Sequence, residues 1–542
     1  MMKFAPVIAS ERRERSNLAL TTSGLRRQAQ AFLAMTLIVL FTPSAYAATV
    51  IPFTINMSEA VNVTGTPRVA VDVGGVTRYA DYTSGTGTST LTFTYAMVAG
   101  DVDLDGVALS SPIDLNGGTI VDLNGNALSD LTFTPPDTSA VKVNYPSLGM
   151  DFVYDADGRY TLNGTVYNDL PSFLGATGGT FTRASVGTYY DSSGVLQTAT
   201  SGTPRFDHDP VTLAPKGVLI EESSTNQMGN SELVGSWVQA NVNVASNTVQ
   251  APDGTMTADT VTTTGGNGLV RQTIITAITA GQTITRTLFA KAGTTSTVIF
   301  EHFDSGYGAT KFNVSTCTLI SAPGDVTTST QQLPNNWCRI QATRTFTAGN
   351  WDTVYIDTYG AAAAGMSIHL WGGQMEVKSF PTSYIPTTSA AVTRAADVFT
   401  VPTGGWFNTS ATSIYASFNS NTINGYNVYR RVIGSSGAGN ANYGELSNTD
   451  TFIRLYNSAT PLDQSTSAIL TGETYAASSN ASGRSLSVHG AAAVSDVAVM
   501  PSFTAFSLGS QSGSTNFLNG HLAKFKYYPV RVADTQLQLL TQ

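Results

Sequence analysis

Ala-Lys-Phe-Lys-Tyr at residues 523–527 and Leu-Thr-Phe-Thr-Tyr-Ala-Met at residues 91–97 carry the pattern that decides the fold. In both stretches, large apolar side chains alternate with Lys, Thr or Ala. Since successive side chains of a strand point to opposite faces, this alternation predicts strands with one buried and one solvated face. Asn-Gly and Asp-Gly pairs, which favour tight turns, separate further stretches of this kind. The sequence therefore predicts an all-β chain with several β-sandwiches in series.

The composition fits an extracellular protein that is rich in turns. Charged residues make up 12% of the 542 residues, about half of the usual share in soluble domains, and glycine occurs 50 times. Low charge argues against intrinsic disorder, which needs a high net charge and few apolar residues. The formal net charge is −9, and a negative chain with few cations is a poor partner for phosphate backbones. We therefore expect no nucleic-acid partner.

Residues 1–47 are predicted to be a secretory signal peptide. Arginines precede an apolar stretch at residues 31–41, and Ala45-Tyr46-Ala47 follows as a small-x-small cleavage pattern. The apolar stretch is too short to cross a bilayer as a stable helix, although an uncleaved anchor is the alternative. No later apolar run is long enough to span a membrane. The prediction is a secreted or cell-surface product with no transmembrane segment after signal removal.

Changes in composition divide the remaining chain into four segments, at residues 48–145, 146–230, 231–390 and 391–542. The first closes at a group of prolines and has the size of an immunoglobulin-like sandwich, about 100 residues. The last two, with about 150 residues each, are long enough for sandwiches of eight or more strands.

Two resemblances concern the first half of the chain. Residues 53–61, 63–67, 73–80, 91–95 and 100–106 resemble, in order, the bacterial Ig-like repeat of surface adhesins, which implies a spacer or adhesion module. Residues 181–185, 204–210 and 217–222 resemble a connector segment common in tailed-phage structural proteins.

Two further resemblances cover the second half. The segment 231–390 is similar to a carbohydrate-binding-like jelly roll, through residues 289–293, 336–339, 371–376 and 381–387. The segment 391–542 resembles concanavalin A and laminin-G-like lectin sandwiches, through residues 393–397, 520–522 and 527–528. Together these likenesses imply carbohydrate or surface binding, and they transfer no catalytic residues.

The chain has two cysteines, Cys317 and Cys338. In an exported protein such a pair is a candidate disulfide, with two free thiols as the alternative. The jelly-roll resemblance favours the bond, because Trp337-Cys338-Arg339 replaces the commoner Trp-Tyr-Arg and puts a thiol where a ring is usual.

Asp101, Asp103 and Asp105 precede Gly106 and form a candidate calcium site. Carboxylates at alternate positions before a glycine turn can converge on Ca²⁺, which prefers six to eight oxygen ligands. The twelfth position is Pro112 where a helix-flanked calcium loop has Glu, so a solvated acidic turn is the alternative.

A candidate saccharide site lies in the fourth segment, where aromatic and guanidinium side chains gather near asparagines. Aromatic faces stack on sugar rings, and polar groups around them fix the orientation of the ligand. The alternative is that half of these rings belong to the core. The candidate ligand-binding residues are Tyr426, Tyr429, Arg430, Tyr443, Arg454 and Tyr456.

None of the five histidines lies in a local catalytic motif. The sequence therefore predicts a secreted or cell-surface, non-enzymatic protein that binds glycans or cell-envelope polysaccharide. One alternative is a phage-derived structural protein of a tail or fibre. Another is an accessory or catalytic part of a polysaccharide-degrading system.

Overall fold

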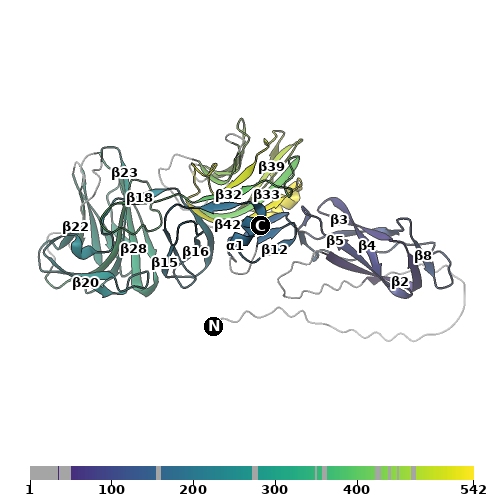
Figure 1. Cartoon of the computed structure of the whole chain (residues 1–542), viewed down its shortest axis with the longest axis horizontal. Coiled ribbons are helices and arrows are strands. Elements are labelled where there is room, and N and C mark those ends of the chain that lie inside the picture. Colours follow the sequence, from purple (N-terminus) through teal and green to yellow (C-terminus); the bar gives the residue numbers. More distant parts are fainter. Residues whose placement is uncertain are drawn as a thin grey trace.

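Strands dominate the computed structural model, which confirms the all-β prediction of tandem sandwiches. The structure describes residues 34–35, 50–153, 160–271, 279–304, 306–347, 351–356, 363–420, 429–436, 441–447, 451–465 and 472–542. Apart from residues 34–35, the predicted signal peptide lies outside these ranges. Three β-rich parts lie in a row: an N-terminal sheet, a central sandwich that holds the C-terminus, and a distal sandwich (Figure 1). The more specific resemblances of each part remain predictions.

The N-terminal sheet is antiparallel, with the order β1-β2-β5-β4-β3-β7, and β8 pairs with β2. In β5, Leu91, Phe93 and Tyr95 are buried, as the alternation predicts. The strands are β1 (Ala34–Met35), β2 (Val50–Thr64), β3 (Arg68–Val73), β4 (Val76–Ser84), β5 (Thr88–Ala96), β7 (Ala108–Asp114) and β8 (Thr119–Asp122), beside the small pair β6 (Val102–Asp103) and β9 (Val143–Asn144).

The central sandwich combines strands from two distant parts of the chain. Its first sheet has the order β12-β11-β10-β42-β33-β38-β39-β40, and β17 joins β42 to β16. These strands are β10 (Leu148–Asp151), β11 (Tyr160–Leu162), β12 (Thr165–Tyr167), β16 (Phe206–His208), β17 (Pro215–Ile220), β33 (Ala411–Ser420), β38 (Glu473–Asn480), β39 (Gly483–Val488), β40 (Val494–Asp496) and β42 (Gly520–Tyr528). Thus β42 pairs with β33 on one edge and with both β10 and β17 on the other.

The second sheet of the central sandwich has the order β13-β32-β41-β34-β35-β36-β37. Its strands are β13 (Thr180–Thr182), β32 (Val398–Pro402), β34 (Arg430–Ser436), β35 (Asn442–Leu446), β36 (Phe452–Tyr456), β37 (Pro461–Ser465) and β41 (Ala505–Leu508). Phe525 and Tyr527 of β42 are buried against Phe506 of β41, so the alternation at residues 523–527 supplies part of this core. The helices α1 (Leu170–Thr177) and α2 (Asp534–Leu540) flank the sandwich.

The distal sandwich packs two six-stranded sheets, β19-β22-β29-β24-β25-β26 and β20-β21-β30-β23-β28-β27. The strands of the first are β19 (Val238–Ala240), β22 (Leu269–Arg271), β24 (Thr297–Asp304), β25 (Gly306–Asn313), β26 (Thr318–Ser321) and β29 (Trp351–Ile356). Those of the second are β20 (Val242–Val249), β21 (Ala258–Thr263), β23 (Thr283–Ala292), β27 (Thr327–Gln332), β28 (Trp337–Thr345) and β30 (Ser367–Glu376), with the short 3-10 helices η2 (Val234–Ser236) and η3 (Pro334–Asn336).

A buried ionic cluster lies where the chain passes between the two sandwiches. The chain leaves the central sandwich through β18 (Ser224–Asn226) and returns through β31 (Val392–Arg394), and these strands pair with each other. Nearby, Asp397 forms ion pairs with Arg183 at 3.0 Å and with Arg205 at 2.5 Å. Glu221 lies 2.8 Å from Arg205 and 3.5 Å from Arg394. Because these side chains are almost fully buried, each charge depends on its partners.

Replacing Asp397 by Asn is expected to cost about 3–5 kcal/mol of unfolding free energy, because it leaves buried guanidinium groups without their counter-charge. The matched control is Asp463→Asn, which removes the partly exposed partner of Arg454 and is expected to cost at most about 1 kcal/mol. Urea denaturation of both variants measures the difference. Equal losses would contradict the role given to the cluster.

Candidate functional site

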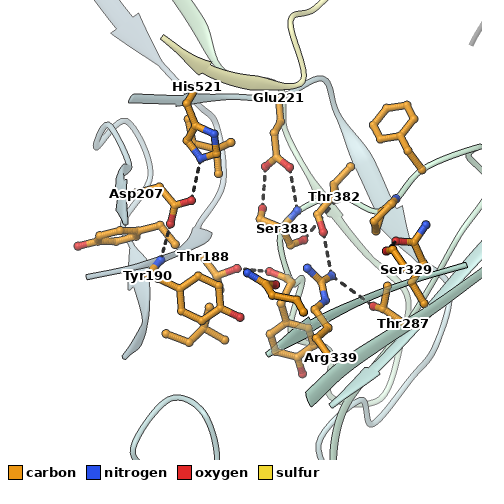
Figure 2. A pocket seen from close by; sticks show the side chains of 18 of the residues that line it. Thr188, Tyr190, Asp207, Glu221, Thr287, Ser329, Arg339, Thr382, Ser383 and His521 are labelled. Carbon is orange, nitrogen blue, oxygen red and sulfur yellow. Dashed lines mark hydrogen bonds and ion pairs between the residues drawn. The ribbon is translucent and has the colours of Figure 1, made fainter. Parts of the chain in front are cut away.

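A pocket of about 450 Å³ lies where the distal sandwich meets the central one. Such a volume falls within the range of small-molecule sites, about 300–1,000 Å³. Its walls come from the hairpin of β14 (Gly187–Tyr190) and β15 (Leu196–Ala199), from β16, β17 and β42, from β23, β27 and β28, and from residues 379–384. His521 and Glu221 extend from one side, and Arg339, Thr287 and Ser329 from the other (Figure 2).

Asp207 and His521 form a hydrogen-bonded pair in the wall of the pocket. Asp207 Oδ2 lies 2.7 Å from His521 Nε2, and Asp207 Oδ1 accepts a hydrogen bond of 2.7 Å from the Tyr190 backbone N–H. Burial opposes ionisation of Asp207, but the hydrogen bond and the charge of His521 outweigh it, so that the pKa of this carboxyl is lowered. An ionised carboxylate at Nε2 favours the tautomer with the proton on Nε2 and leaves the lone pair on Nδ1.

The strand between these two residues contributes a glycine. Asp207 stands on β16 and His521 on β42, and β17 runs between them with Gly217 opposite Asp207. Gly217 has a φ of 104°, and a Cβ there would lie 2.3 Å from the backbone oxygen of Leu522. Only glycine therefore fits this position, which keeps β16 and β42 close enough for the pair to form.

The second carboxylate in the wall of the pocket, Glu221, is fixed by hydrogen bonds and ion pairs to neighbouring residues. It accepts hydrogen bonds from Ser383, at 2.8 Å from the backbone N–H and 2.7 Å from the hydroxyl, in addition to its ion pairs with Arg205 and Arg394. Burial opposes its ionisation, but the two guanidinium groups outweigh it and lower the pKa of Glu221 strongly. Glu221 is therefore a fixed anion and has no proton to give at neutral pH.

The lining of the pocket also includes polar groups that are not satisfied. Arg339 Nη2 donates to the Thr382 carbonyl at 2.9 Å and to Thr287 Oγ1 at 3.3 Å. Arg339 Nε and the hydroxyl of Tyr190 are buried and make no hydrogen bond within the described part of the chain. Burial raises the pKa of Tyr190, so its hydroxyl keeps its proton at neutral pH.

Two of the predicted saccharide ligands lie in the interior of the central sandwich. The ring of Tyr443 is buried, with its centroid 5.2 Å from that of Phe503 and 6.4 Å from that of Phe506. Arg430 is also buried and donates to Ser420. Tyr443 therefore lies in the core, as the alternative for half of the rings expects, and saccharide binding by either residue stays a prediction.

Two more of the predicted ligands meet at β36. The Arg454 guanidinium lies 4.9 Å from the ring centroid of Tyr429 and 5.0 Å from that of Phe452, and it forms an ion pair of 2.6 Å with Asp463. Tyr456 is half-buried at the end of the same strand. Tyr426 lies outside the described residues. Saccharide binding by this group stays a prediction.

The three aspartates of the candidate calcium loop are engaged by different protein donors. Asp101 pairs with Arg78 at 2.7 Å, and Asp103 accepts from two backbone N–H groups, those of Gly74 and Gly106. Asp105 accepts from Gln536 Nε2 at 2.6 Å, and Gln536 Oε1 accepts from the Leu104 N–H at 2.8 Å. Across the described ranges, no group of three or more His, Cys, Asp or Glu side chains is placed to hold a metal ion. The loop thus connects the N-terminal sheet to α2 of the central sandwich.

Cys317 and Cys338 form a disulfide with their Cα atoms 5.4 Å apart. The bond joins the turn between β25 and β26 to β28, and so links the two sheets of the distal sandwich inside its core.

No local pattern in the sequence marks Asp207 and His521 as a pair. Both lie in stretches quoted for a resemblance, at residues 204–210 and 520–522, but 314 positions separate them. No local spacing signals such a contact, since it arises from the pairing of β16, β17 and β42.

Comparison with known proteins gives weak likenesses only. No family model and no curated protein matches the chain. The matching solved structures include Trypanosoma rangeli sialidase with sialic acid, at 9% identity, a TM-score of 0.22, and coverage of 91% of this chain and 68% of that one. Trypanosoma rangeli sialidase in complex with the inhibitor DANA matches at 11% identity and a TM-score of 0.23, with coverage of 94% of this chain and 93% of that one. Trypanosoma rangeli sialidase without a named ligand matches at 10% identity and a TM-score of 0.23, with coverage of 94% of this chain and 98% of that one.

These matched structures are enzymes, which contradicts the prediction that the chain is non-enzymatic, and that prediction is corrected. It rested on missing local motifs and on the resemblances, whereas Asp207 and His521 lie far apart in the sequence and still form a carboxylate–imidazole pair. TM-scores of 0.22–0.23 assign neither a fold nor a reaction to this chain. Among the described residues, no helix is long and apolar enough to cross a membrane.

Replacing Asp207 by Asn is expected to lower the unfolding free energy at neutral pH by about 1.5–3 kcal/mol, because a hydrogen bond to a charged group is lost. The pKa of Asp207 is lowered in the folded chain, so its stabilising effect is complete above the ordinary value of about 4 and is lost as the pH falls through the folded-state value. The difference between parent and variant should therefore be constant above about pH 5 and shrink below about pH 4, as the pH falls through the folded-state pKa. Urea titrations across this range check it, and a difference that is constant throughout would contradict it.

Proposed function

We propose that this chain binds a saccharide in the pocket between the two sandwiches and works as part of a polysaccharide-degrading system. The observation that carries the proposal is the composition of the wall. Tyr190, Phe380 and Tyr384 line it with almost fully buried rings, beside the side-chain amides of Gln331 and Gln341 and several threonine and serine hydroxyls. Sugar rings present apolar C–H faces to aromatic groups and hydroxyls to hydrogen-bonding groups, so a mixed lining of this kind suits them.

The rigidity of the site supports the proposal. Residues 382–384 are tied to the central sandwich through Ser383 and Glu221, and Tyr384 contacts Phe289 and Trp371 of the distal sandwich at ring distances of 5.6 and 4.9 Å. A preformed pocket saves the entropy that ordering a loop around the ligand would cost. A polysaccharide outside the cell also agrees with the predicted export of the chain.

A second candidate function, ester hydrolysis on a substituted saccharide, is favoured by the Asp207–His521 pair. In this reaction His521 Nδ1 takes a proton from a water molecule, whose oxygen attacks the ester carbonyl carbon. The bond between that carbon and the sugar oxygen then breaks, and the proton passes from His521 to the leaving sugar hydroxyl. The products are a carboxylic acid and the free sugar hydroxyl, and no co-reactant is needed. Asp207 acts as a positioning residue that orients the imidazole.

Saccharide binding is tested by a glycan array and by calorimetry on the full chain. Gln331→Ala removes a side-chain amide from the wall of the pocket and is expected to weaken binding by about 2- to 10-fold, the value of one or two neutral hydrogen bonds. Gln239→Ala, the same change on exposed β19, is the control and should leave the affinity unchanged. A chain that binds no saccharide, or binds equally after Gln331→Ala, would contradict the proposal.

Hydrolysis is tested on acetylated polysaccharides by the release of acetate. His521→Gln is expected to lower kcat by about 100- to 10,000-fold, the usual contribution of a general base, while saccharide binding changes little. His489→Gln, in the turn that follows β39, is the control and should retain activity. Acetate release that survives His521→Gln would show that this pair is not the base.

A further inference from the structure

Two cationic side chains line the pocket without a hydrogen-bonded ion pair to a carboxylate of the described residues, although the charge of one of them, Lys216, acts on Asp207 and Asp209. Among the charged residues that line it, the two carboxylates already have partners: Asp207 contacts His521, and Glu221 contacts two buried arginines behind the wall. Lys216 and Arg339 also line the pocket, and neither forms an ion pair with a carboxylate of the described residues. The wall therefore offers two cations to a ligand, and its anions are satisfied by the protein.

Arg339 is held in place and still has hydrogen-bonding capacity. Its Nη2 is fixed by the Thr382 carbonyl and by Thr287, and the guanidinium carbon lies 5.4 Å from the ring centroid of Phe289. Its Nε has no partner in the described chain. A donor that is buried and unsatisfied destabilises the free protein, and a ligand oxygen that accepts from it removes this cost.

Tyr190 adds a second donor of this kind. Its side chain is 7% exposed, its hydroxyl is buried without a partner among the described residues, and it lines the same pocket as Arg339. Tyr190 cannot shift easily to reach another acceptor, because its backbone is fixed by Asp207 and by the pairing of β14 with β15. The hydroxyl therefore has an unused hydrogen-bonding capacity in the free protein.

From these three groups we infer that the pocket selects an anionic saccharide, and that Lys216, Arg339 and the Tyr190 hydroxyl bind its carboxylate. The inference rests on the proposed function and adds the substrate class. A carboxylate has only acceptor sites, in number enough for several donors, and its hydrogen bonds to guanidinium and ammonium groups are stronger than those of a neutral hydroxyl. The amide and hydroxyl groups of the wall remain for the sugar hydroxyls.

The test measures binding of the full chain to pairs of oligosaccharides that differ in one respect. Each pair consists of a uronic-acid oligomer and its fully methyl-esterified, uncharged counterpart, and sulfated oligosaccharides form a third arm. The uronate is expected to bind at least 10-fold more tightly than its ester at low ionic strength, and this preference should fall as salt is added. Equal affinities within every pair would overturn the inference while leaving the proposed saccharide binding intact.

Single substitutions test which residues cause the preference for the uronate over its ester. Arg339→Gln and Lys216→Gln are each expected to reduce uronate binding by about 10- to 100-fold, as for hydrogen bonds to charged groups, and to leave the ester within about twofold. Lys142→Gln, an exposed change directly before β9 in the N-terminal part of the molecule, is the control. Tyr190→Phe removes only a hydroxyl without a partner, so the fold should be retained while uronate affinity falls.

Three results contradict the inference. If uronate binding is unchanged in Tyr190→Phe and Lys216→Gln, the carboxylate of the ligand does not bind in this pocket. Binding of sulfated but not of carboxylated sugars would show that the anion is a sulfate group. Absence of binding in all arms, charged or neutral, would overturn the proposed function together with the inference.

Discussion

Two buried carboxylates, Asp397 and Glu221, hold the middle of the molecule together. They pair with three guanidinium groups, from Arg183, Arg205 and Arg394, at the place where the chain crosses between the sandwiches. Charges removed from water are tolerated only with good partners, so this cluster fixes the relative position of β16, β17 and β31. The pocket depends on that position, because its walls come from both sides of the crossing.

Local patterning was enough to predict the class of fold. The alternation at residues 91–97 reports which face of β5 is buried. Pairing between distant strands is not visible in such patterns. Val218 lies opposite Leu522, and Leu148 opposite Tyr527, yet each of these strands looks the same in the sequence whatever its neighbour is.

The site was harder to predict than the fold, for the same reason. Tyr443 belongs to the type of residue that binds sugars, but a ring in the middle of a fully buried strand packs in the core. Asp101, Asp103 and Asp105 have the spacing of a calcium loop, but their neighbours supply donors from Arg78 and Gln536, far away in the chain. In each case the residue type was informative, and the deciding factor was which partners the tertiary structure brings near.

The place of β42 next to β10 and β17 has a consequence for how the protein is made. The N-terminal strands of the central sandwich are synthesised long before β42, which ends at Tyr528 near the C-terminus. Until then their edges lack a partner, and contacts of such large sequence separation form slowly. The nascent chain therefore carries open strand edges through most of its synthesis, and premature termination leaves them exposed to aggregation.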